Sequence, residues 1–318
     1  MEIAWKERIA RELPEAFELD RLVLHYQPIV RLDNPTVVQV EALVRWPHPE
    51  YGELVAGMFI PSAADLGMLS YLDRWTLERA CAEAAQWNAM GRVHPELALS
   101  INIAPEEFQT PNFVNLALGI ISDAGFRPGC VVLEISEAGR LTDPDLARWN
   151  LKEIRSCGVR IAIDDFGCKQ SLSHYHRLPA DQLKLDGTLV RGIARDDALR
   201  GVVEAVAEMA CAESTCVVAE GVETSQELEA VRKLGCTLGQ GFYIARPMPG
   251  QQLLDFLDRV RSMSAADRRK ARRSRSRFAR RQGKEPRSPT ASLRPPSDSR
   301  RSITFEWPSA HGRGGDDR

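Results

Sequence analysis

The stretch Glu41-Ala42-Leu43-Val44-Arg45-Trp46 places a carboxylate inside an apolar run. The run begins at Val37 and predicts a buried strand, because β-branched and aliphatic residues dominate it. A buried carboxylate is costly unless it meets a cation, a metal ion or a strong hydrogen-bond donor. Glu41 therefore has two interpretations at this point: it is one half of an internal ion pair with an arginine, or it belongs to a functional site.

Polar residues recur at the ends of further strand-like runs along the chain. Any one of them is more simply a cap or a satisfied ion pair, but together they are difficult to explain as stability devices. The runs lead to residue types that metal or phosphate sites use: Asn102 after 97–101, Glu134 after 131–133, Asp164 and Asp165 after 159–163, Lys184 and Asp186 after 182–183, Glu220 after 216–219, and Gln240 in the run that follows Cys236.

Segments with helical periodicity separate these strands. They are residues 72–87, 113–124, 146–157, 198–212, 225–234 and 251–261. Strands that alternate with helices predict an α/β fold with a parallel sheet, and roughly eight strands in about 240 residues favour closure into a (β/α)8 barrel. The active site of such a barrel lies at the carboxyl ends of its strands, where these polar residues fall.

Charge divides the 318-residue chain into two unequal parts. Residues 1–261 carry 26 Lys and Arg against 38 Asp and Glu, a net charge of −12, whereas residues 262–318 carry 16 against 6, a net charge of +10. We predict a helical lead-in over 1–21, a barrel domain over 22–261 and a disordered Arg-rich tail over 262–318. The tail has too few apolar residues to offset the entropy cost of ordering.

The tail has two interpretations. Nine of the fourteen residues from Arg268 to Arg281 are basic and none is acidic. The tail is either a solvated extension or an electrostatic handle for nucleic acid, an anionic membrane or an acidic protein.

Cysteine usage and hydropathy predict a cytoplasmic protein. The seven cysteines are an odd number without metal-site spacing, which is typical of reduced thiols. No apolar run approaches the roughly 18 residues of a membrane span, and the start of the sequence has no signal-peptide pattern.

Nine motifs occur in an order and at a spacing that resemble the EAL-domain family, the cyclic di-GMP phosphodiesterases. They are Tyr26-Gln27-Pro28-Ile29, Glu41 to Trp46, Phe59-Ile60-Pro61, Ser100-Ile101-Asn102, Glu134-Ile135-Ser136-Glu137, Asp164-Asp165-Phe166-Gly167, Lys184-Leu185-Asp186, Ala219-Glu220-Gly221-Val222-Glu223 and Gly239-Gln240-Gly241-Phe242. The resemblance covers about residues 22–250. It implies a modified TIM barrel whose first strand runs antiparallel to its neighbours.

The resemblance also implies a role for each site residue. The implied ligands of Mg²⁺ or Mn²⁺ are Glu41, Asn102, Glu134, Asp164 and Asp165; the implied catalytic residues are Lys184 and Glu220; the implied contacts to cyclic di-GMP are Gln27, Arg45, Asp186, Glu223 and Gln240; and Glu137 is the implied anchor of a loop. Carboxylate and amide oxygens are hard ligands that suit Mg²⁺, and two ions about 3.5–4 Å apart can generate hydroxide and stabilise both reacting oxygens. The implied reaction is metal-dependent hydrolysis of cyclic di-GMP to linear pGpG.

One loop departs from the family pattern. Active members usually continue Asp-Asp-Phe-Gly with Thr-Gly-Tyr-Ser-Ser-Leu-Ser, whereas this chain continues with Cys168-Lys169-Gln170-Ser171-Leu172-Ser173 and is one residue shorter. The family uses this loop to organise the metal site and to form a dimer contact, so a homodimer is one implied assembly. The departure is either neutral drift or a loss of turnover with binding retained. An active hydrolase and a catalytically weak receptor for cyclic di-GMP therefore both stay open, while Gln27 and Arg45 argue against a scaffold that ignores the nucleotide.

Overall fold

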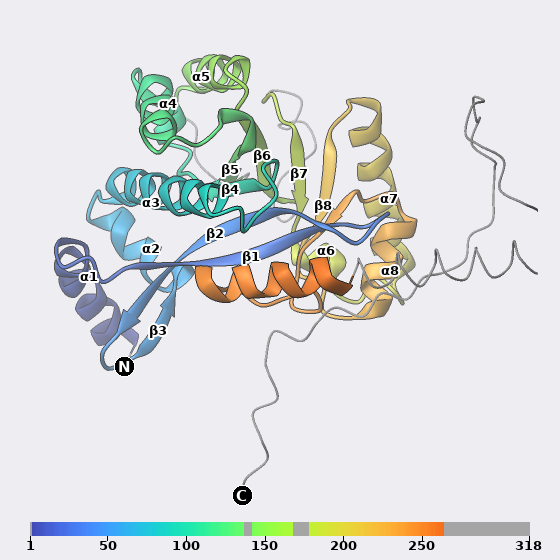
Figure 1. Ribbon diagram of the computed structural model, residues 1–318, viewed down its shortest axis with the longest axis horizontal. Helices are drawn as coiled ribbons and strands as arrows, with labels where there is room; N and C mark the ends of the chain where they lie inside the picture. Colours follow the sequence, from blue (N-terminus) through green and yellow to red (C-terminus); the bar gives the residue numbers. More distant parts are fainter. Residues whose placement is uncertain (1, 137–141, 168–177, 264–318) are drawn as a thin grey trace, which may run out of the picture. The chain divides into compact units, whose positions relative to one another are not determined.

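The computed structural model describes residues 2–136, 142–167 and 178–263 (Figure 1). Contacts between Cα atoms divide the chain into two units, Met1–Leu254 and Asp255–Arg318. The first unit contains a closed barrel, and the described part of the second, residues 255–263, is helical. Glu137, the altered loop at 168–173 and nearly all of the predicted tail lie outside the described residues.

Eight strands close the barrel of the first unit. They are β1 (Val23–Arg31), β2 (Val37–His48), β4 (Ala98–Asn102), β5 (Val131–Ser136), β6 (Arg160–Phe166), β7 (Gln182–Leu185), β8 (Cys216–Ala219) and β9 (Leu238–Gly239). Neighbouring strands from β2 to β9 pair in parallel, and β1 closes the ring by pairing with both β2 and β9. The barrel predicted from the alternation of strands and helices is confirmed.

The first strand runs antiparallel to both of its neighbours, as the family resemblance implied. The connection from β1 to β2, residues 32–36, is too short for the crossover that a parallel pair needs. The two strands therefore form a hairpin and lie side by side in Figure 1. This pairing sets Gln27 opposite Glu41.

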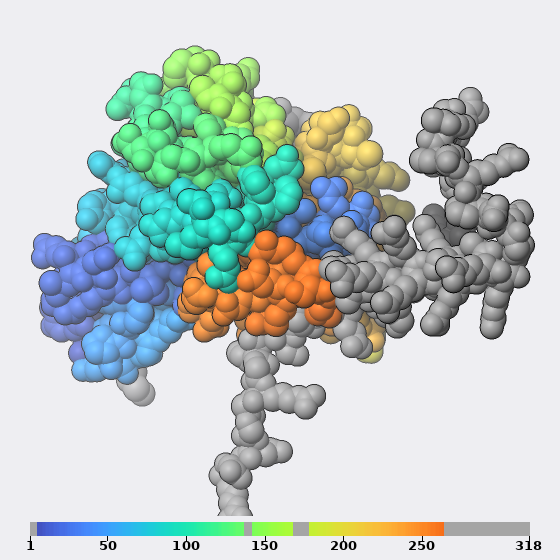
Figure 2. Space-filling view, in the orientation of Figure 1, coloured from blue at the N-terminus to red at the C-terminus, as the bar shows by residue number. Residues whose placement is uncertain are grey.

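Helices cover the outside of the barrel between its strands. They are α1 (Glu2–Glu18), α2 (Ala56–Asp65), α3 (Leu69–Ala89), α4 (Phe113–Asp123), α5 (Pro144–Ser156), α6 (Gly187–Val190), α7 (Asp197–Ala212) and α8 (Ser225–Lys233), with 3₁₀ turns η1 (Glu107–Gln109) and η2 (Pro128–Cys130). Figures 1 and 2 show α3, α4 and α5 packed side by side. Within the described chain no helix is long and apolar enough to cross a membrane.

Short side chains fix where several helices begin. The carboxylates of Asp143 and Asp196 accept hydrogen bonds from the first backbone N–H groups of α5 and α7. At α8, Thr224 and Glu227 form a reciprocal capping box. These caps begin the helices within a few residues of where the apolar periodicity predicts them. Two short strands, β3 (Gly52–Val55) and β10 (Met248–Pro249), and the helices α2 and α6 were not predicted.

Candidate active site

Every strand of the barrel supplies one polar side chain to a single inward-facing group. Six come from within strands, and Glu220 and Gln240 directly follow β8 and β9, where their backbone N–H groups donate to Leu185 O and Ala219 O. We call this set the polar ring: Gln27, Glu41, Asn102, Glu134, Asp164, Lys184, Glu220 and Gln240. All eight were named as site residues from the sequence, and the structure brings them together.

The ammonium of Lys184 lies among four carboxylates of the polar ring. Its Nζ lies 2.6 Å from Glu134 Oε2 and 2.7 Å from Glu220 Oε1. It also lies 3.1 Å from Asp164 Oδ1 and 3.7 Å from Glu41 Oε2. The lysine side chain is only 1% exposed, so these pairs form largely out of contact with water.

Amide side chains hold the remaining face of Glu41. Asn102 Nδ2 donates to Glu41 Oε1 at 2.9 Å, and Gln240 Nε2 donates to Glu41 Oε2 at 2.6 Å. Gln240 Nε2 also reaches Gln27 Oε1 at 3.1 Å, and Gln27 Nε2 donates to Ala245 O at 3.0 Å. The buried Glu41 carboxylate is therefore satisfied by amides and by Lys184, not by the arginine that one interpretation of the sequence expected.

The polar ring contains more negative charge than its one cation can balance. Its four carboxylates and one ammonium leave a formal charge of −3 when all are ionised. Burial raises the pKa of Glu220 to about 8, and burial followed by the charge of Glu41 raises the pKa of Glu134 well above its ordinary value. Burial opposes the charge of Lys184, but the surrounding carboxylates raise the pKa of its ammonium well above the usual range.

The donor set fits a divalent cation in charge and in atom type. A divalent cation would offset the excess negative charge, and carboxylate and amide oxygens are the ligands Mg²⁺ and Mn²⁺ take in proteins. Glu134 Oε1 is buried and has no hydrogen-bond partner among the described residues. The carboxylates converge on Lys184 Nζ, and no three Asp, Glu, His or Cys side chains of the described residues are grouped as a metal cage. Binding would therefore require these side chains to turn from the lysine.

Asp165 lies next to the polar ring and is held in a special backbone conformation. Its φ is +57°, in the left-handed region that few residues other than glycine adopt. Ser136 Oγ donates to Asp165 Oδ2 at 3.2 Å. The charge of Asp165 is close enough to help raise the pKa of Asp164, after burial as the main cause. Strained conformations of this kind are frequent at functional sites.

Two of the predicted substrate-binding residues, Asp186 and Glu223, make their side-chain contacts outside the polar ring. Asp186 caps α6, where its Oδ1 accepts a hydrogen bond from Thr188 N at 2.8 Å. Glu223 is half exposed and forms an ion pair with Arg191 at 3.4 Å. Their predicted contacts to the nucleotide stay predictions, and so does the anchoring role of Glu137, which lies outside the described residues.

Arg45 has two neighbours that the sequence did not predict. Its Nε lies 3.7 Å from Glu53 Oε1, and His25 Nε2 lies 3.4 Å from Glu53 Oε2. Burial lowers the pKa of Arg45, and the charges of Glu53 and Glu41 oppose that effect. Glu53 belongs to β3, which pairs with β2, and nothing in the sequence around it signals a strand at a rim.

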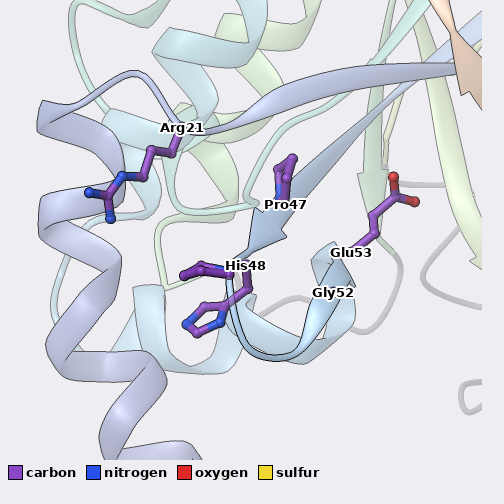
Figure 3. Close-up of a pocket in the computed structure, with 6 residues that line it drawn as sticks. Arg21, Pro47, His48, Gly52 and Glu53 are labelled. Carbon is purple, nitrogen blue, oxygen red and sulfur yellow. The ribbon is translucent and has the colours of Figure 1, made fainter.

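Glu53 also lines a hollow of about 560 Å³ beside the β2–β3 hairpin. Figure 3 shows Arg21, Pro47, His48 and Gly52 around the same hollow, with the Glu53 carboxylate extending away from His48. No residue of the polar ring lines it. The hollow therefore lies outside the candidate active site.

A second polar layer lies two residues below the ring on three strands. Gln39 Nε2 donates to Gln182 Oε1 at 3.1 Å, and Gln182 Nε2 donates to Gln39 Oε1 at 2.8 Å. Gln39 also donates to Ser100 Oγ. Side chains alternate along a strand, so Gln39 shares the inner face with Glu41, and Gln182 with Lys184. The sequence signal was the same as for Glu41, a polar residue inside an apolar run.

The sequence also matches a known family and known proteins. The sequence model of one protein family, the EAL domain, matches residues 10–247. The chain belongs to the EAL domain family. This EAL domain is 34% identical over 248 residues to the bifunctional diguanylate cyclase/cyclic di-GMP phosphodiesterase MucR of Pseudomonas aeruginosa, a match that covers 78% of this chain and 36% of MucR. It is 36% identical over 251 residues to the cyclic di-GMP phosphodiesterase NbdA of the same organism, covering 79% of this chain and 32% of NbdA.

Solved structures of EAL proteins share the fold. The MucR phosphodiesterase in complex with cyclic di-GMP superposes with a TM-score of 0.72 at 34% identity and covers 77% of this chain and 99% of that one. The EAL enzyme Bd1971, in a form bound to cAMP and cyclic di-GMP, gives a TM-score of 0.75 at 28% identity and covers 81% and 70% of the two chains. The EAL domain described here spans about a third of the length of the curated relatives MucR and NbdA.

Proposed function

We propose that this EAL domain hydrolyses one phosphodiester bond of cyclic di-GMP and releases linear pGpG, with Mg²⁺ or Mn²⁺ as cofactor. The observation that carries the proposal is the polar ring, in which four carboxylates, those of Glu41 and Glu134 buried and those of Asp164 and Glu220 partly buried, meet Lys184 at the carboxyl end of the barrel. Two of the relatives are named as cyclic di-GMP phosphodiesterases, and the MucR structure holds this nucleotide.

The proposed site divides into a cation-binding part and a part for proton transfer. Glu41, Asn102, Glu134, Asp164 and Asp165 would hold the divalent cations. When bound, such ions activate water and stabilise negative charge on the phosphate oxygens. Glu220, whose Oε1 lies 2.7 Å from Lys184 Nζ, would be the base that takes a proton from the attacking water.

Lys184 and the amide and guanidinium groups complete the proposal. A water oxygen bonds to phosphorus as Glu220 takes a proton from it, the P–O3′ bond breaks, and the 3′ oxygen leaves as a hydroxyl with a proton from solvent. Lys184 keeps its charge because its pKa is raised, so it can stabilise charge on the phosphate during this step. Arg45 would bind phosphate, and Gln27 and Gln240 would orient the nucleotide through their amides.

The proposal is tested by incubating purified protein with cyclic di-GMP and Mg²⁺ or Mn²⁺ and separating the products by chromatography. We expect linear pGpG, and no product after chelation of the metal. Glu41→Gln keeps the size of the side chain and should lower turnover at least about 100-fold. Loss of a residue that only hydrogen-bonds to a metal ligand typically costs 10–100-fold in metal affinity or activity, and loss of a ligand should cost more. Glu229→Gln, at a partly exposed position of α8 outside the polar ring, is the matched control and should leave turnover unchanged. Normal turnover in Glu41→Gln or with chelator would rule the mechanism out.

A catalytically weak receptor for cyclic di-GMP is the second candidate. The observation that favours it is the altered sequence Cys168-Lys169-Gln170 after the paired aspartates. Binding of cyclic di-GMP measured in Ca²⁺ separates the two functions. Binding together with product formation in Mn²⁺ supports the hydrolase, and binding without product supports the receptor.

A further inference from the structure

The carboxylate of Asp73, on the outer helix α3, contacts the turn that follows β4, the strand that carries the predicted metal ligand Asn102. Asp73 lies in α3, which packs against β4. Its Oδ2 accepts a hydrogen bond from Ala104 N at 2.7 Å. Ala104 is two residues beyond Asn102, the last residue of β4 and a member of the polar ring.

The turn after β4 is held from both sides. On the barrel side, Ile103 N donates to Glu134 O at 2.9 Å and so continues the ladder to β5. On the helix side, Asp73 takes the next N–H group along the chain. Asn102 lies directly before these two fixed amides, so its backbone has little freedom, and its Nδ2 reaches Glu41 Oε1 at 2.9 Å.

A carboxylate is an expensive way to satisfy this one amide. Burial raises the pKa of Asp73 to about 7, and the nearby charges of Glu106 and Glu107 add to the effect. An uncharged acceptor would satisfy Ala104 N without that cost. What bears on the site is the hydrogen bond itself, because it holds the backbone two residues beyond Asn102, a predicted ligand.

We propose that Asp73 is a positioning residue that fixes the turn after β4, and through it the direction in which Asn102 presents its amide oxygen to a divalent cation. The proposal rests on the proposed function, since it needs Asn102 to be a ligand. Its physical basis is that groups hydrogen-bonded around a ligand orient it, and their loss typically costs 10–100-fold in metal affinity.

The test compares Asp73→Ala, Asp73→Asn and a control in the full chain. Asp181→Ala is the control, because Asp181 Oδ2 also accepts a strand amide, Ile161 N at 2.8 Å, but near the start of β6 and away from the polar ring. Mn²⁺ binding is measured by calorimetry without nucleotide. The Mn²⁺ concentration at half-maximal turnover is measured separately, and hydrogen exchange is followed over residues 98–109.

We expect Asp73→Ala to weaken Mn²⁺ binding about 10-fold or more and to speed exchange at the Ala104 amide. Asp73→Asn keeps a carbonyl acceptor of the same size and should stay within about twofold of wild type in both measurements. Asp181→Ala should lose stability while its Mn²⁺ affinity stays at the wild-type value. If Asp73→Ala does not fold, Asp73→Ser replaces it. The serine keeps a polar side chain, but its hydroxyl is one bond too short to reach Ala104 N, so the hydrogen bond is still lost.

Three outcomes would overturn the proposal: unchanged Mn²⁺ affinity in a folded Asp73→Ala or Asp73→Ser, equal losses in Asp73→Ala and Asp181→Ala, or an Asp73→Asn variant that binds Mn²⁺ as poorly as Asp73→Ala while the Ala104 amide stays protected. Failure of the proposed function is distinguishable, because the wild-type protein would then form no product in Mn²⁺, whereas failure of the Asp73 proposal leaves wild-type Mn²⁺ binding and turnover intact.

Discussion

Lys184 Nζ lies 2.6 Å from Glu134 Oε2, and both side chains are almost fully buried. The pair joins β5 to β7 across the interior of the barrel, with β6 between them. Lys184 thereby stands where a cation is needed to offset the carboxylates of the polar ring. The first prediction follows from this contact.

Lys184→Met should destabilise the protein by about 3–5 kcal/mol at neutral pH without divalent cations, because it leaves buried carboxylates without their partner. Added Mn²⁺ should raise the melting temperature of the variant more than that of wild type, since the cation replaces the lost charge. Thermal unfolding with and without Mn²⁺ measures both effects. Lys152→Met, at an exposed position of α5, is the control and should change stability by less than about 0.5 kcal/mol. Equal Mn²⁺ effects in wild type and Lys184→Met would contradict the charge argument.

The capping box of α8 gives a prediction for acid pH. Burial opposes the charge of Glu227, but hydrogen bonds from Gly192 N and Glu223 N lower the pKa of its carboxyl below the ordinary value. An acid whose pKa is lower in the folded protein than in the unfolded chain stabilises the fold at any pH above its unfolded-state pKa. This stabilisation is lost as the pH falls through the folded-state pKa. Glu227→Gln should thus be less stable than wild type at neutral pH, with the difference shrinking in acid. Denaturant unfolding across this range measures it.

Two further variants complete that experiment. Thr224→Ala removes the other half of the box and should cost about 1 kcal/mol. Glu204→Gln changes an exposed residue of α7 and should follow the wild-type stability curve. A constant gap between Glu227→Gln and wild type at every pH would show that the ionised form of Glu227 is not preferred by the folded state.

Asp73→Asn should become more stable than wild type as the pH rises. The pKa of Asp73 is raised to about 7 by burial, against about 3.9 in an unfolded chain. An acid with a raised pKa costs stability as the pH increases from the unfolded value through the folded one. The advantage of the variant should grow through this window and level off above it, and each unit of pKa difference is worth about 1.4 kcal/mol. Parallel stability curves for the two proteins would place the Asp73 pKa near its ordinary value.

If the altered loop at 168–173 has lost its role in organising the metal site, turnover should be slow while binding of cyclic di-GMP is retained. Replacing Cys168-Lys169-Gln170 by Thr-Gly-Tyr-Ser, which adds one residue, should raise the turnover rate more than the affinity for cyclic di-GMP. Initial rates in Mn²⁺ and binding in Ca²⁺ measure the two quantities separately. A rate that does not change after the replacement would identify the loop sequence as neutral drift.

The basic tail predicts salt-sensitive binding to polyanions. Nine basic residues between Arg268 and Arg281 should release counterions from DNA or anionic liposomes, so the affinity should fall steeply as salt rises. A chain that ends at Arg261 should lose this binding and keep its chemistry toward cyclic di-GMP. Sedimentation with liposomes and titration with DNA at low and high salt provide the measurement. If the full chain binds neither at low salt, the tail is only a solvated extension.

The sequence predicted the barrel and the polar ring because both depend on regular patterns. Alternating strands and helices require a parallel sheet, and the carboxyl ends of parallel strands meet at one end of a barrel. Polar residues that end separate strands, such as Asn102 and Glu134, are therefore brought together whatever the details of the loops. Gln27 and the reversed direction of β1 came from the family resemblance alone.

Contacts between specific side chains were harder to predict. Glu41 was expected to meet an arginine if it formed an ion pair, but its cation is Lys184, on a strand far away in the sequence. Asp73 gave no signal, since a charge on an amphipathic helix is usually solvated and its contact with Ala104 depends on how α3 is rotated on the barrel. β3 and α6 have only 4 residues each, too few for a periodic pattern to appear.

The pairing of the first strand of the barrel with the last has a consequence for protein synthesis. Gln27, near the start of the barrel, receives a hydrogen bond from Gln240, near its end, and β1 pairs with β9 only once both have left the ribosome. While the intervening strands are made, β1 is therefore paired with β2 and lacks β9. Because Gln240 also completes the surroundings of Glu41, a partly synthesised chain has an unfinished site. The assembly of the site is thus tied to the last strand of the barrel, and an interrupted translation product would lack the complete polar ring.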